Sequence, residues 1–212
     1  MIRVSCQNLQ QVKNDPALYA ANLVSKTKSG RRRGMFSQWQ TVARELHIEK
    51  IPLTEGVKRL SSLYSIWVDN ERNRNRESFF QESLIRYHNI FIKKGFVFQD
   101  GNHVMKWQLH KNVMLGGYTP CVAVKYNRYY AYAFTEHYFD WSSELRFPLL
   151  QHYLSTQTLH CGLSDLQIGI YSLADHRFDF RTFSAREIVS VKKETIEIFE
   201  ALSREYLKRS AI

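Results

Sequence analysis

The spacing of apolar residues changes from a helical to a strand period close to residue 100. In EGVKRLSSLYSIWVDN the apolar residues recur at intervals of three or four, which predicts a helix with one buried stripe. They are Val57, Leu60, Tyr64 and Trp67. In HVMKWQLH, which begins at His103, apolar and polar residues alternate, as in a strand that buries one face. A chain with a helical first half and an alternating second half is restricted to folds in which helices pack on a sheet, so we expect an α/β protein.

The order of the predicted elements in the second half specifies the sheet further. Strands are predicted near residues 104–110, 119–126, 129–136, 166–173 and 178–184. A helix is predicted near 142–157, and the last helix begins with a capping box in which Ser184 caps and Glu187 reaches back. We expect the first three strands to be sequential antiparallel neighbours. The whole would form a mixed β-sheet of about five strands flanked by helices.

Length and composition favour one domain. The 212 residues, of which 44% are hydrophobic, are enough for a full core. We expect residues 1–100 to form a mainly helical lead-in and residues 101–212 to form the sheet and its helices. The chain has no apolar run long enough to span a bilayer, and its start lacks the apolar stretch of a signal peptide, so we expect no membrane partner.

The cysteines provide no metal or disulfide framework. Cys6, Cys121 and Cys161 are widely spaced, odd in number and form no CxxC pair. This pattern argues against structural zinc, an iron–sulfur cluster and a set of disulfides. We therefore expect a cytoplasmic protein without a cofactor.

The charge balance favours a polyanionic partner. The formal net charge is +10, from 30 Lys+Arg against 20 Asp+Glu. Such an excess favours nucleic acid, and we expect DNA more than RNA. The densest cationic stretch is KTKSGRRR, whose charges we expect to contact phosphates. These charges are Lys26, Lys28, Arg31, Arg32 and Arg33. Two alternatives remain open: the run is a solvated linker, or the basic surface binds an acidic protein partner.

Four stretches carry a resemblance to a known family. They are VSCQNLQQVKNDPALYA, RRGMFSQWQTVARELH, GYTPCVAVKYNRYYAYAFTEH and DWSSELRFPLLQHYL. In this order they resemble the PD-(D/E)XK nuclease superfamily, and within it the RecB-like exonuclease domains, over most of the chain. The resemblance implies a restriction-endonuclease-like core. In that family a Pro-Asp strand and a following (D/E)-x-K strand carry the catalytic groups, and a preceding helix carries a histidine.

The catalytic identities of the family are missing under this alignment. Cys121 stands where the aspartate is expected, Ala133 and Thr135 stand where the acidic residue and the lysine are expected, and Gln38 falls near the histidine. The family's metals, Mg²⁺ or Mn²⁺, demand oxygen ligands, which a thiol and an alanine do not supply. We expect Cys121, Ala133 and Thr135 to converge on one small, uncharged strand face. The resemblance thus implies a nuclease fold whose catalytic residues are lost.

A second cluster offers an alternative metal site. Glu136, His137, Asp140 and Glu144 crowd the end of one predicted strand and the start of the next helix. They would hold Mg²⁺ or Mn²⁺ if the carboxylates had been relocated, although acids near a helix start are also favoured by the helix dipole. Whether the protein is an enzyme is therefore left open.

Three functions follow from these patterns. The first is a catalytically inactive nuclease-fold protein that binds nucleic acid, or a structural subunit of a DNA-processing or mobile-element assembly. The second is an active metal-dependent nuclease with relocated carboxylates. The third is a basic scaffold for an acidic protein partner.

Overall fold

The computed structural model describes residues 1–25, 34–101 and 103–210, and in this part of the chain it is an α/β protein, as expected. Its seven α-helices are α1 (Leu9–Asn14), α2 (Pro16–Val24), α3 (Met35–Ile48), α4 (Leu53–Tyr64), α5 (Glu71–Lys93), α6 (Arg146–Tyr153) and α7 (Ala185–Ser210). Its strands are β1 (Ile2–Ser5), β2 (Val97–Asp100), β3 (Val104–His110), β4 (Val113–Tyr118), β5 (Cys121–Lys125), β6 (Arg128–Thr135), β7 (Leu166–Ser172) and β8 (Arg177–Arg181).

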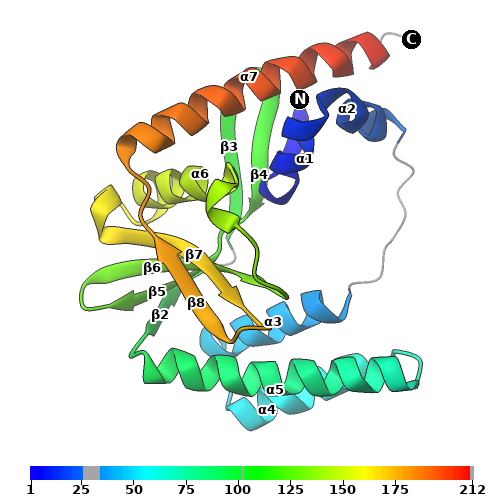
Figure 1. Cartoon of the computed structure of the whole chain (residues 1–212), viewed down its shortest axis with the longest axis vertical. Coiled ribbons are helices and arrows are strands. Elements are labelled where there is room, and N and C mark those ends of the chain that lie inside the picture. The colour runs from blue at the N-terminus through cyan, green and yellow to red at the C-terminus, as the bar shows by residue number, and fades with distance from the viewer. Residues whose placement is uncertain (26–33, 102, 211–212) are drawn as a thin grey trace.

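A mixed five-stranded sheet lies at the centre of the molecule (Figure 1). Its strand order is β2-β5-β6-β7-β8, in which β6 and β7 are parallel and the other neighbours are antiparallel. Helix α6 connects the parallel pair, because two parallel neighbours need a crossover rather than a tight turn. The prediction of a mixed sheet of about five strands flanked by helices is confirmed.

The strand predicted near 104–110 belongs to a different sheet, so its expected pairing with residues 119–126 is wrong. It forms β3, which pairs with β4 in a three-stranded sheet of order β1-β4-β3. Strand β4 was not predicted, because its glycines, Gly116 and Gly117, are more typical of a turn than of a strand. Its residues Val113 and Leu115 are buried, and this burial determines its place in the sheet. The pairing of 119–126 with 129–136 is confirmed as β5 with β6.

The N-terminal segment also differs from the expected helical lead-in. Residues Ile2 and Val4 are buried and alternate with exposed or half-exposed residues, so the chain begins as a strand that pairs in parallel with β4. Helical structure starts only after Ser5. The first hundred residues are otherwise mainly helical, with β2 as their last element.

The two faces of the five-stranded sheet are covered by different layers (Figure 1). Helices α3, α4 and α5 cover one face, and their apolar side chains form one hydrophobic cluster with that face. Helix α6, the three-stranded sheet, α1, α2 and α7 build a second cluster against the opposite face. The result is a layered structure in which β5 and β6 are shielded on both sides.

Local signals in the sequence determine where the long helices begin and end. Asn70 accepts a hydrogen bond from the backbone N–H of Asn73 at the start of α5, and Gly95 follows its end with a φ of 70°. The predicted capping box at α7 is confirmed: Ser184 Oγ accepts from the Glu187 N–H at 3.3 Å, and Glu187 Oε2 accepts from the Ser184 N–H at 2.7 Å.

Candidate functional site

The β5–β6 pair directs the expected site residues to opposite faces of the sheet. Cys121 lies opposite Tyr132, and Val122 lies opposite Ala131. Because side chains alternate along a strand, Cys121 shares its face with Tyr132, whereas Ala133 and Thr135 point to the other face with Ala131. The expected convergence of Cys121, Ala133 and Thr135 on one face is therefore wrong. The alternation along each strand was read correctly, but the register between the strands was not available from the sequence.

The face that carries Cys121 is filled with aromatic rings rather than left open. Helix α3 contributes Trp39, whose ring centroid lies 5.0 Å from that of Phe134 with the planes at 88°. Helix α5 contributes Tyr87, which lies 5.2 Å from Phe134 and 5.0 Å from Tyr171 in edge-to-face geometry. Tyr132 completes the layer 5.0 Å from Phe178. Edge-to-face pairs of this kind each contribute about 0.5–1.5 kcal/mol beyond their buried area, so the layer is a stable core.

A chain of hydrogen bonds runs through this aromatic layer. His47 Nε2 lies 2.8 Å from the Tyr87 hydroxyl, which in turn lies 2.7 Å from the Tyr132 hydroxyl. Burial lowers the pKa of His47 to about 4, helped by the nearby His88. Burial also raises the pKa of Tyr87 and Tyr132 well above that of a free tyrosine. All three groups are neutral near pH 7, and they satisfy one another's polar atoms in a buried setting.

The surroundings of Cys121 disfavour the ionised form of its thiol. Burial raises the pKa of its thiol to about 11, and the neighbouring Arg44 opposes this shift only in part. Metal binding requires the thiolate, which this environment disfavours at neutral pH. The Arg44 guanidinium also lies 5.9 Å from the Phe134 ring centroid, so a cation already occupies the neighbourhood of Cys121.

Gln38 does not lie with the other three positions. Its amide donates to the carbonyl of Leu63 at 3.4 Å, and its Oε1 accepts from the Trp67 indole at 3.2 Å. Gln38 therefore joins α3 to the end of α4. The resemblance puts the family histidine near this position. The helix turns Gln38 away from the sheet and instead directs Trp39 towards it.

The four residues of the alternative metal site have separate partners. Glu136 pairs with Arg76 at 3.1 Å, Asp140 accepts from the Ser142 hydroxyl at 3.0 Å, and Glu144 pairs with Arg146. His137 is exposed. Within residues 1–25, 34–101 and 103–210, no group of three or more His, Cys, Asp or Glu side chains is placed to hold a metal ion.

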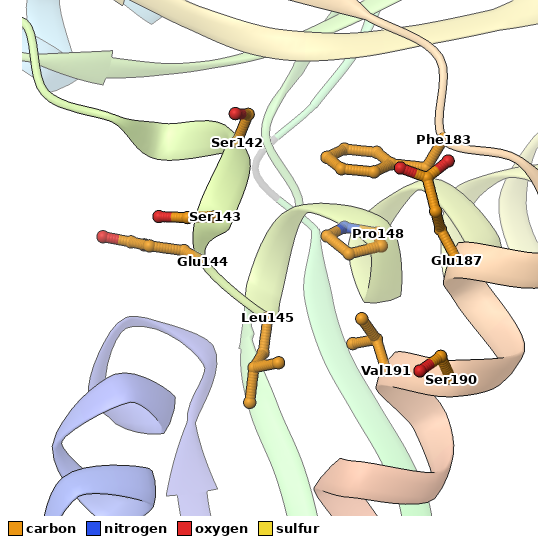
Figure 2. Close-up of a pocket in the computed structure, with 9 residues that line it drawn as sticks. All are labelled: Ser142, Ser143, Glu144, Leu145, Pro148, Phe183, Glu187, Ser190 and Val191. Carbon is orange, nitrogen blue, oxygen red and sulfur yellow. The ribbon is translucent and has the colours of Figure 1, made fainter.

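A small pocket of about 200 Å³ lies beside this segment (Figure 2). Glu144 stands on one side of it and Glu187, at the start of α7, on the other. Both carboxylates already have partners, since Glu187 accepts from Ser184 and pairs with Arg181 at 2.6 Å. The pocket therefore offers an apolar floor, including Pro148 and Val191, and no uncommitted charge.

His47 and Tyr87 were not identified from the sequence, and a second set of residues, the cationic run, cannot be placed. His47 and Tyr87 were not singled out, although Tyr87 lies three residues after Leu84 and four before Phe91, and so belongs to the same buried stripe of α5. Lys26, Lys28, Arg31, Arg32 and Arg33 lie outside the described residues.

No protein-family model matches this chain, and no curated protein is significantly similar to it in sequence.

Proposed function

We propose that this chain is a catalytically inactive nuclease-fold protein that binds nucleic acid, alone or as a structural subunit of a DNA-processing or mobile-element assembly. The observation that carries the proposal is the aromatic layer over β5 and β6. In the PD-(D/E)XK resemblance, two neighbouring strands hold the metal with carboxylates. The matching strands here bury Cys121, Tyr132 and Phe134 against Trp39 and Tyr87.

The aromatic layer disfavours catalysis for two physical reasons. A hard cation such as Mg²⁺ needs several oxygen ligands and keeps some of its water, whereas the buried side chains of β5 and β6 on this face are Cys121, Ala123, Tyr132 and Phe134, none of them a carboxylate. Loss of metal stabilisation at the scissile phosphate removes several kcal/mol from the transition state, which corresponds to orders of magnitude in rate. The relocated-carboxylate alternative is disfavoured because Glu136 and Glu144 are each paired with an arginine.

The charge of the chain supports nucleic acid as the partner. A net charge of +10 creates a field that attracts a polyanion and accelerates its association. None of the helices in the described part of the chain combines the length and the apolar character needed to cross a membrane. Counterion release on binding makes such an interaction strongly dependent on salt.

Two measurements on the purified full chain test this function. Incubation with labelled single- or double-stranded DNA and Mg²⁺ or Mn²⁺ is expected to give no cleavage above background. Fluorescence anisotropy is expected to show DNA binding that weakens steeply as salt is raised. Cleavage that Glu136→Ala or Asp140→Ala abolishes would show an active, relocated site. Absence of binding at low salt would leave a protein scaffold as the function.

A further inference from the structure

Among residues 1–25, 34–101 and 103–210, no element covers one face of the three-stranded sheet. Met105 and Val113 point inward and are buried, while their strand neighbours point outward. The outer face consists of the outward side chains of β1, β4 and β3. Its members include Arg3, Lys106, Gln108, Met114, Gly116 and Tyr118. Tyr118 is 65% exposed and lies opposite Val104, which is 61% exposed.

The outer face is positive because its strands contain no acidic residue. Strands β1, β3 and β4 have no Asp or Glu, and the sequence has none between Asp100 and Glu136. Arg3 and Lys106 lie on the face, and Lys111 lies in the turn at its end. Elsewhere on the described surface, cations such as Arg59 are surrounded by acids, here Glu45, Glu49 and Glu55. The outer face differs from such a balanced surface.

Gly116 lies in the middle of the outer face. Gly116 lies between Ser5 of β1 and Lys106 of β3, so the middle row of the sheet has no side chain on its central strand. A Cβ at Gly116 would meet only the carbonyl oxygens of Met105 and Val4, at 3.6 and 4.0 Å, which are ordinary contacts. Packing inside the protein therefore does not require a glycine here. Gly116 and Tyr118 are two residues apart on β4 and share the outer face, so no side chain of β4 stands between them on that face.

We propose that the outer face binds single-stranded nucleic acid, with a base stacked on Tyr118 over Gly116 and the phosphates held by Arg3 and Lys106. Bases of a single strand are free to stack on an aromatic side chain, and cations along the sheet neutralise the backbone. A duplex keeps its bases stacked on one another, so it must first unstack a base before that base can stack on Tyr118. This inference rests on the proposed nucleic-acid function and gives that function a location and a strand preference.

The test compares the full chain with variants in anisotropy titrations of fluorescein-labelled oligothymidylate and of a duplex of equal length. Tyr118→Ala is expected to weaken single-strand binding about tenfold, and Tyr118→Phe to retain it, because stacking needs only the ring. Gly116→Val places a side chain beside Tyr118 and is expected to weaken binding, without lowering the thermal midpoint, because valine favours strands. Arg3→Ala with Lys106→Ala is expected to lower the salt slope by about 0.7 for each lost phosphate contact.

Matched controls separate this site from general effects. Tyr126→Ala removes another tyrosine, 87% exposed in the β5–β6 turn, and Arg74→Ala removes a cation that Asp69 already neutralises at 2.7 Å. Neither control is expected to change the affinity more than about twofold. If the wild type binds single strands but the outer-face variants bind equally well, this inference is overturned while the proposed function stands. A preference for duplex also overturns it. If the wild type binds no nucleic acid at all, both fail.

Discussion

At the residue scale, the protonation state of the half-buried His47 affects the stability of the core. Its ring stacks on Phe98 with centroids 5.2 Å apart and hydrogen-bonds Tyr87, so it is held between α3, α5 and β2. Protonation would place a charge among aromatic rings, which is why burial lowers its pKa from 6.5 to about 4. The folded core therefore contains His47 in its neutral form at neutral pH.

This shift predicts an acid-sensitive core. Between pH 6.5 and about 4 the unfolded chain binds a proton at His47 that the folded chain does not, so stability is complete above pH 6.5 and falls as the pH falls. The loss reaches about 3 kcal/mol near pH 4. Urea unfolding of the wild type and of His47→Gln at several pH values measures it. The variant does not titrate at this position, so its stability is expected to fall less. If the free energy of unfolding depends on pH equally in the two proteins, the pKa of His47 is not lowered in the folded protein.

At the element scale, the capping box of α7 carries a second prediction. Ser184→Ala removes the acceptor for the Glu187 N–H and the hydroxyl that donates to Glu187 Oε2 at 2.7 Å. We expect a loss of about 1 kcal/mol in the free energy of unfolding, typical of an N-cap. Ser190→Ala is the matched control: Ser190 is exposed within α7, where alanine favours the helix. Equal stability of the two variants would show that the cap contributes nothing.

Local signals in the sequence predicted where strands and helices lie better than they predicted which strands pair with each other. The strands at β5 and β6 and the start of α7 follow from alternation and capping, which act within a few residues. The pairing of β3 with β4 does not follow from such local signals. Gly116 and Gly117 are atypical of a strand, and β4 is stabilised by contacts with residues distant in the sequence. The same limit applies to the candidate site. Cys121 and Ala133 alternate correctly along their own strands, but which of them share a face depends on register.

At the scale of the whole molecule, the layered structure separates the buried strands β5 and β6 from the accessible surface. The face of β5 and β6 that carries Cys121 is packed under α3 and α5, while the outer face of the three-stranded sheet stays accessible. A buried aromatic layer adds stability and excludes water, whereas a metal site needs carboxylates and water within reach. The proposed function therefore uses only the accessible surface and needs no access to the buried face.

The strand register predicts that introducing the residue identities of the nuclease family does not produce cleavage. In the triple variant Cys121→Asp, Ala133→Glu, Thr135→Lys, the new aspartate lies on the face opposite the new glutamate and lysine, because Cys121 pairs with Tyr132 rather than with Ala133. The three groups therefore cannot bind one metal. The aspartate also enters the aromatic layer, where burial of a carboxylate is costly, and we expect a loss of about 2–3 kcal/mol even with Arg44 nearby.

Two measurements on the wild type and the variants test this prediction. Nuclease assays with Mg²⁺ or Mn²⁺ are expected to show background activity for the triple variant, and thermal unfolding to show a midpoint well below that of the wild type. The double variant Ala133→Glu, Thr135→Lys is the control that leaves the aromatic layer unchanged and shows how much of the loss belongs to Cys121→Asp. Metal-dependent cleavage by a folded triple variant would require Asp and Glu side chains on one face. The strand register, and with it the assignment of the buried face, would then be wrong.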